Sequence, residues 1–312
     1  MALNAKRLTP YWPVAILLAI AFFIAWAFAA TTLANAGSMG LPLDDSYIYL
    51  TYAKQFGRAQ PFTYYPGGGY SAGSTSVLWP MVLAPFWTLG ARGHALVWVS
   101  FGVCAALYAC VAVGVYRFVR KVRGCKPAGI NAAAMLLVIP PFAFCALSGM
   151  EVAFAAALLV ASLLLLVDQS PDGPPTKRLV ACLAAASLSR PEAMLLVGAI
   201  VGIAVLARLR KRAWKPAAWW LLPLVPPIVW LLANRLIAGN FFPNTGVAKS
   251  HFYLPGFDWV YWKLTVIDLT KRMFRGLFWE KTSPLLWTRV VLALFLFGSA
   301  RIAWWAWREK KF

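Results

Sequence analysis

Acidic residues are scarce in this 312-residue chain, which has ten Asp and Glu against thirty Lys and Arg. Charged residues of both signs make up only 13% of the sequence, where soluble domains carry about a quarter. Two histidines alone cannot build a zinc site, and five cysteines, four of them in apolar runs, do not suggest a disulfide framework. Because 61% of the residues are hydrophobic, disorder and an ordinary soluble domain are excluded, and the composition indicates a membrane protein.

Long apolar runs are abundant, and most of them approach the roughly 20 residues that a bilayer-spanning helix needs. We expect eight spans, at residues 13–33, 95–116, 128–147, 152–167, 179–189, 193–207, 216–236 and 285–307. The first run is longer than the core of a signal peptide, which favours a retained anchor. The fifth and sixth runs are short and are joined by Arg190-Pro191-Glu192, so we predict a hairpin that turns at membrane depth.

The distribution of Lys and Arg predicts the orientation of these spans. The apolar stretch 75–89 is short and contains two internal prolines, so we expect it to lie flat on the membrane. Five connecting and terminal stretches then face the cytoplasm, and their 47 residues carry 17 of the thirty basic residues. The long connection 238–284 faces outward with only 6, in agreement with the positive-inside rule. The sequence therefore predicts an all-α integral membrane protein with both termini inside and two interfacial helices in the first outer loop, residues 34–93.

Four of the ten acids lie at the outer ends of the predicted spans or inside the hairpin: Asp44, Asp45, Glu151 and Glu192. Ionisable groups at such depths are costly, and they are candidates for function. Asp44 and Asp45 open the first interfacial helix, where an acid could simply cap the helix and complement its dipole. One acid is enough for a cap, and adjacent helical residues point in different directions, so catalysis stays open for this pair.

Glu151 and Arg190 each allow a structural and a functional interpretation. The run Ser148-Gly149-Met150-Glu151 matches a capping box, in which Ser148 would be the N-cap of the next helix. Arg190, left at the end of the fifth run, needs an acid or a phosphate, because its guanidinium binds both bidentately. An ion pair with Glu151 or Glu192 would satisfy it, and in either case we expect a polar cavity that faces outward.

Two polar loops lie on the same predicted face. Residues 62–76 are rich in glycine without the spacing of a nucleotide-binding loop, and aromatic residues such as Tyr65 would suit a sugar. A flexible connection explains the same composition. Residues 241–251 follow the seventh run and contain Asn244 and Lys249, and Lys249 could meet a phosphate or lipid headgroups.

Six short motifs occur in order: Asp44-Asp45-Ser46-Tyr47, Tyr65-Pro66-Gly67, Ser74-Thr75-Ser76-Val77-Leu78-Trp79, Ser148-Gly149-Met150-Glu151, Arg190-Pro191-Glu192 and Phe242-Pro243-Asn244-Thr245. Together they resemble the GT-C class of integral-membrane glycosyltransferases, most closely the bacterial cell-wall arabinofuranosyltransferases, over about residues 10–252. We therefore expect a GT-C-like membrane module at residues 1–252. Residues 253–312 are expected to add an outer amphipathic segment and a last span, without the C-terminal outer domain that such arabinofuranosyltransferases carry.

The resemblance implies transfer of a sugar from a polyprenyl-phosphate donor to a glycan or lipid acceptor on the periplasmic face of the plasma (inner) membrane. It implies Asp44 as the catalytic base with Asp45 beside it, and Glu151 as an acceptor-binding group or, with Asp45, a ligand of a divalent cation. The residues expected to bind donor or substrate are Arg190, Lys249, Glu192, Tyr65 and Asn244. Nucleic acid is not an expected partner, and a second protein could supply the missing outer domain. The alternative is a non-catalytic subunit that binds or flips a polyprenyl-phosphate lipid.

Overall fold

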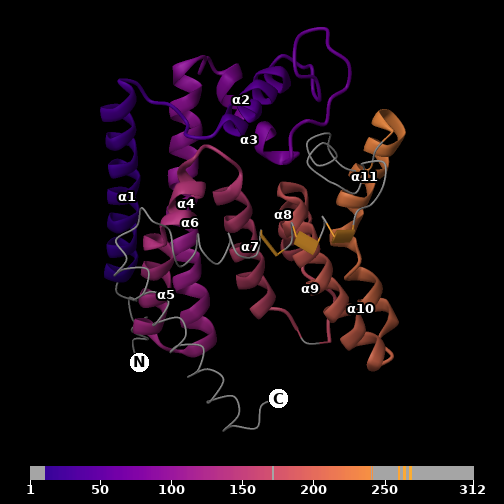
Figure 1. Cartoon of the computed structure of the whole chain (residues 1–312). Helices are drawn as coiled ribbons and strands as arrows, with labels where there is room; N and C mark the ends of the chain where they lie inside the picture. The colour runs from indigo at the N-terminus through magenta and orange to yellow at the C-terminus, as the bar shows by residue number, and fades with distance from the viewer. Residues whose placement is uncertain are drawn as a thin grey trace, which may run out of the picture. The chain divides into compact units, whose positions relative to one another are not determined.

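The computed structural model describes residues 11–170, 172–239, 241, 259–260, 263–264 and 267–268. Every regular element in these ranges is helical, as predicted (Figure 1). The elements are α1 (Trp12–Ala36), α2 (Asp44–Gly57), α3 (Leu78–Thr88), α4 (His94–Arg123), α5 (Lys126–Val138), α6 (Pro140–Leu147), α7 (Val152–Val167), α8 (Lys177–Ser189), α9 (Pro191–Arg210), α10 (Trp214–Trp219), the 3₁₀ turn η1 (Leu222–Leu224) and α11 (Val225–Ala238). The chain divides into two compact units, residues 1–249 and 250–312, and all these elements belong to the first.

Four helices in the described ranges are long and apolar enough to cross a membrane, and the bent pair α5–α6 would make a fifth span. The four are α1, α4, α9 and the run Trp214–Ala238, which contains α10 and α11. Helices α7 and α8 have 16 and 13 residues, fewer than the roughly 20 that a full span needs. The predicted span at 285–307 lies outside the described residues. The described helices thus support a membrane protein with four or five spans, and the number eight stays a prediction.

Several predicted spans have different boundaries in the structure: α4 continues to Arg123 where the prediction ended at 116, and the run 216–236 is divided among α10, η1 and α11. The run 128–147 is not one helix, because α5 and α6 meet at an angle of 68°. Between them Ile139 is extended (φ −71°, ψ 110°), since a residue before proline is pushed out of the helical region and Pro140 has no N–H to donate. The sixth run is longer than predicted: α9 continues for 20 residues to Arg210, so the α8–α9 hairpin has unequal arms.

Helix α4 is the centre of the N-terminal bundle, because α1, α5 and α7 all pack against it. Glycines allow the closest of these approaches. A Cβ atom on Gly114 of α4 would lie 2.5 Å from Cγ1 of Val160 in α7, and one on Gly129 of α5 would lie 2.8 Å from the carbonyl oxygen of Tyr116. Small residues at such crossings let helices gain van der Waals contact where lipid supplies no hydrophobic drive.

Helices α2 and α3 pack against each other at the end of the bundle where α1 ends and α4 begins (Figure 1). The sequence predicts two helices in this connection, and both are present, although α3 begins three residues later than the predicted stretch 75–89. Their position at a membrane surface stays a prediction. This end of the bundle also holds the turn between α6 and α7, which organises the candidate site.

Candidate functional site

The turn between α6 and α7 is buried and accepts hydrogen bonds from three other helices. The Ser46 hydroxyl of α2 donates to the carbonyl of Ser148 (2.8 Å). The indole N–H of Trp79 in α3 and the hydroxyl of Ser100 in α4 both donate to the carbonyl of Gly149, at 3.0 and 3.2 Å. Gly149 has φ +84°, a conformation that other residues adopt only with strain. Segments far apart in the sequence are therefore fixed to one turn.

Glu151 closes this turn with its side chain only 1% exposed. Its Oε1 lies 3.0 Å from Nη1 of Arg190, and its Oε2 has no hydrogen-bond partner among the described residues. Burial raises the pKa of the Glu151 carboxyl, while the Arg190 cation opposes that shift. The predicted capping box is wrong, because the Ser148 hydroxyl instead donates to the carbonyl of Cys145 (2.8 Å) and Glu151 itself is the N-cap of α7.

Arg190 joins Glu151 to a second acid. Its Nε lies 3.2 Å from Oε2 of Glu192, and its Nη2 donates to Oε1 of the same carboxylate at 3.4 Å. Both structural alternatives predicted for Arg190 are therefore present at once. The backbone presents the guanidinium from an extended residue between α8 and α9 (φ −155°, ψ 145°), because the following Pro191 disfavours the helical conformation. The Glu192 side chain is 71% exposed, so its half of the network is open to solvent.

Helix α2 brings Tyr49 to the buried acid. Tyr49 is buried, and its hydroxyl and the Glu151 carboxyl lie close enough to influence each other: the pKa of Tyr49 is raised first by burial and then by Glu151. Asp45 lies four residues before Tyr49 on the same face of the helix and is half-buried. Asp44 is exposed, lies on the face of Tyr47, and accepts a hydrogen bond from the Asp45 N–H (2.9 Å). Of the two acids, Asp45 thus shares a helix face with the residue next to Glu151.

A small cavity of about 20 Å³ lies beside Arg190 and is walled by Thr75 and by Trp230 of α11. The segment before α3 is fixed to this place, because the Val77 N–H donates to the carbonyl of Leu188 at the end of α8 (3.2 Å). A cavity of this size has room for about one water molecule. The cavity is therefore too small for a sugar unless side chains in its wall move.

The glycine-rich loop packs onto α11. The Tyr70 hydroxyl donates to Oδ1 of the buried Asn234, and the rings of Phe62 and Trp230 lie 5.0 Å apart. Tyr65, predicted to bind substrate, is 64% exposed on this loop, and its carbonyl accepts a hydrogen bond from the Gly68 N–H (3.0 Å). The predicted binding residues Asn244 and Lys249 lie outside the described residues.

The predicted metal site needs more ligands than the structure brings together. In the ranges that the structure describes, no three His, Cys, Asp or Glu side chains lie close enough to hold a metal ion. Glu151 is already paired with Arg190. A Mg²⁺ ion held by one or two carboxylates normally needs substrate phosphates and waters to complete its shell. These described residues alone therefore do not fit a resident divalent cation.

The structure gathers Glu151, Arg190 and Glu192, and it places Tyr49 and Trp230 beside them, which the sequence did not single out. Neither aromatic residue carries a distinctive signal in an apolar chain with 16 tryptophans and 11 tyrosines. No family model, curated protein or solved structure matches this chain. Its function is therefore inferred from its own residues.

Proposed function

We propose that this chain is a membrane glycosyltransferase that moves a sugar from a polyprenyl-phosphate donor to an acceptor hydroxyl. The observation that carries the proposal is the Glu151–Arg190 pair, with an acid that is 1% exposed, beside the N-terminal half of α2. Segments from four of the six sequence motifs meet there, through the contacts of Ser46, Trp79, Glu151 and Arg190. Such a transfer needs a base for the acceptor hydroxyl and a cation for the donor phosphate. The two carboxylates at the start of α2 and the neighbouring Arg190, paired with the buried Glu151, would supply these groups.

The reaction is a single displacement with inversion at the anomeric carbon. The acceptor oxygen bonds to that carbon, the bond from the carbon to the phosphate oxygen breaks, and the acceptor proton passes to an Asp carboxylate. The lipid phosphate leaves as a stable anion without protonation, so one general base is sufficient. Asp44 or Asp45 is that base, and the shared helix face of Asp45 and Tyr49 favours Asp45. The guanidinium of Arg190 stabilises negative charge on the departing phosphate.

The proposal includes a membrane arrangement of eight spans, with α2 and α3 interfacial on the periplasmic face of the inner membrane and both termini cytoplasmic. The ends of two long helices support this orientation. Helix α4 begins near α2 and ends with Arg120, Lys121 and Arg123, and α9 begins next to Arg190 and ends with Arg208 and Arg210. Both helices thus carry their basic ends away from the candidate site, as the positive-inside rule requires if the site faces outward.

The test is sugar transfer by the full chain in lipid vesicles, with radiolabelled polyprenyl-phosphate arabinofuranose and polyprenyl-phosphate hexoses as donors. Loss of the general base should lower the rate by roughly 10²–10⁴-fold, so Asp45→Asn or Asp44→Asn should show a loss of that size. The matched control is Asp172→Asn, which removes an exposed acid paired with Lys211. Full transfer by both Asp44→Asn and Asp45→Asn would refute the mechanism. Polyprenyl-phosphate binding by the wild type without transfer from any donor would instead support a non-catalytic lipid-binding subunit.

A further inference from the structure

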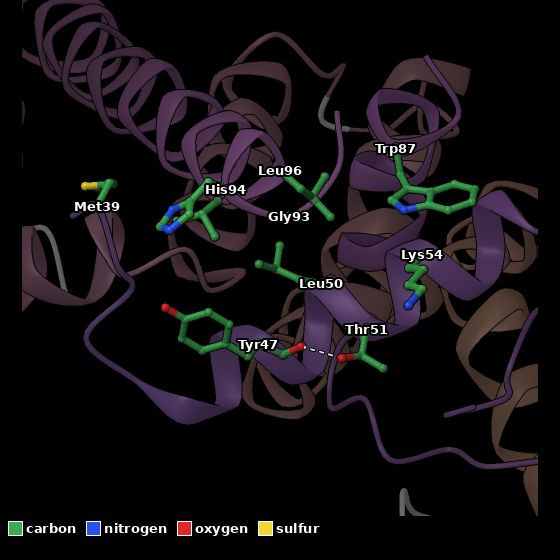
Figure 2. Close-up of a pocket in the computed structure, with 10 residues that line it drawn as sticks. Met39, Tyr47, Leu50, Thr51, Lys54, Trp87, Gly93, His94 and Leu96 are labelled. Carbon is green, nitrogen blue, oxygen red and sulfur yellow. Dashed lines mark hydrogen bonds between the residues drawn. The ribbon is translucent and has the colours of Figure 1, made fainter. Parts of the chain in front are cut away.

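A second pocket lies between α2, α3 and the start of α4. Its volume is about 480 Å³, and its walls contain neither Glu151 nor Arg190. The residues that line it are Met39, Tyr47, Leu50, Thr51, Lys54, Trp87, Gly93, His94, Leu96 and Val97. Figure 2 shows Lys54 and Trp87 toward one end of the pocket, Tyr47 and His94 toward the other, and Leu50 and Leu96 between them. The pocket thus combines polar ends with an apolar middle.

The end of the pocket at Trp87 is strongly cationic. Lys54 lines it, and the guanidinium carbons of Arg58 and Arg92 lie 5.5 and 5.0 Å from the centre of the Trp87 ring. None of the ion pairs in the part of the chain that the structure describes involves these three cations. No acid lines the pocket. Two arginines therefore contact the indole that walls this end of the pocket, Lys54 lines the pocket itself, and their combined positive charge attracts an anion.

The backbone adds a separate positive charge, toward the end of the pocket where Figure 2 shows His94. Gly93 and His94 begin α4, a helix of 30 residues, and both line the pocket. The N-terminus of a helix carries a partial positive charge and favours anions, phosphate above all. The nearest acids of α2, Asp44 and Asp45, lie about ten residues from Lys54, which is roughly 15 Å along a helix. Their charge therefore does not cancel that of the cationic end.

Trp87 is held in place by close packing on α2. A Cβ atom on Gly57 would lie 2.5 Å from Cε3 of the Trp87 ring, so the indole lies directly on the α2 backbone. An aromatic wall fixed in this way presents a rigid surface between Arg58 and Arg92. Its position does not depend on the ligand, which lowers the entropy cost of binding.

We propose that this pocket binds a phosphate ester whose carbon chain lies on the apolar middle of the pocket. The phosphate pairs with Lys54, the two arginines on the Trp87 ring add positive charge from outside the lining, and Leu50, Leu96 and Val97 contact the chain. An anionic phospholipid and a soluble phosphate ester share this chemistry. The site is separate from the Glu151–Arg190 cluster, so the proposal stands independently of the transferase reaction.

The experiment is native mass spectrometry of the full chain with two lipids, phosphatidylglycerol and phosphatidylcholine, and with glycerol 3-phosphate as the soluble probe. The wild type should retain phosphatidylglycerol in preference to phosphatidylcholine. Losing a hydrogen-bonded charge contact typically weakens binding by about tenfold or more, so Lys54→Gln with Arg92→Gln should show a loss of this size. Lys54→Arg with Arg92→Lys keeps the charge and should bind within a few-fold of the wild type.

Further variants separate the pocket from general attraction to a basic protein. Lys177→Gln with Arg178→Gln removes two charges from the first turn of α8 and should leave binding unchanged. Thr51→Glu, which adds a carboxylate to the half-exposed wall beside Lys54, should weaken binding without removing any native charge. Displacement by glycerol 3-phosphate would identify a soluble ligand, and retention of phosphatidylglycerol alone would identify a lipid. Equal binding of both lipids with no binding of glycerol 3-phosphate, or equal losses in the α8 control, would overturn the proposal.

Discussion

Replacing Arg190 with alanine should destabilise the folded chain, because it leaves the carboxylate of Glu151 buried without a cation. The Glu151 side chain is 1% exposed and that of Arg190 is 28% exposed. Breaking a buried ion pair by removing one partner typically costs about 3–5 kcal/mol. Glu151 could escape part of this by taking a proton. At pH 7 that costs about 3.4 kcal/mol for a carboxyl with an ordinary pKa of 4.5, at 1.36 kcal/mol per unit. Both routes predict a loss of about 3 kcal/mol.

The free energy of unfolding is best measured at pH 7 by titrating lipid–detergent micelles with a denaturing detergent and following tryptophan fluorescence. Glu151→Gln in the Arg190→Ala background removes the stranded charge, so the double variant should be less destabilised than the two single losses added together, by about 2 kcal/mol. Glu192→Gln is the matched control, because its carboxylate is 71% exposed and such pairs contribute about 0–1 kcal/mol. A loss below about 1 kcal/mol for Arg190→Ala, or strict additivity in the cycle, would refute the buried pair.

Three further predictions concern the same bundle. Glu151→Gln should gain stability relative to the wild type as the pH rises above 4.5. Burial raises the pKa of the Glu151 carboxyl, so the wild type loses stability when this group gives up its proton, and the glutamine has no proton to lose. If the free energies of unfolding of the two proteins changed in parallel with pH, this prediction would be contradicted. Gly114→Ala should destabilise the fold by about 1–3 kcal/mol and lower the apparent Tm, because the added methyl group clashes with Val160. Gly102→Ala on the same helix is the control: its methyl group meets no atom within 4 Å, so the apparent Tm should not fall. Glu192→Gln should tighten polyprenyl-phosphate binding by about 1.5–5-fold in a direct binding assay, since it removes an anion from Arg190; weaker binding would show that Glu192 contacts the substrate.

Local sequence signals predicted the long helices well and the packing poorly. The apolar runs of α1 and α4 are continuous, and their structure is set by residues within one or two turns, so both were found within a few residues at the candidate-site end. The break at Ile139 was missed although two prolines follow it, because two prolines among many apolar residues leave the average hydropathy of the run 128–147 high. Helix α9 continues beyond the predicted end at 207 because a charged residue such as Arg208 or Arg210 ends an apolar run without ending a helix.

The partners of the candidate site depend on tertiary contacts that no short window contains. The capping motif at Ser148 does not form, because the Ser148 hydroxyl donates to the carbonyl of Cys145 in α6; the Ser148 carbonyl accepts from Ser46, 102 residues away. For Arg190 the sequence offered Glu151 or Glu192 as alternatives, and the structure uses both, because α8 packs against α7 and Arg190 follows the end of α8. The sequence therefore identified the ionisable residues that are expensive to bury, and only the fold shows which of them form ion pairs.

The charge of this cluster limits how a phosphate could bind. If Glu151 and Glu192 are both ionised, the two acids outweigh Arg190 and the cluster carries one negative charge, which repels an anionic donor. The two acids differ in burial, because the Glu151 side chain is 1% exposed and that of Glu192 is 71% exposed. A donor phosphate would then displace only the exposed carboxylate of Glu192, while the buried acid would keep Arg190 in position. If Arg190 binds the donor, Glu151 therefore orients the guanidinium, and Glu192 occupies the phosphate position on Arg190 in the absence of donor.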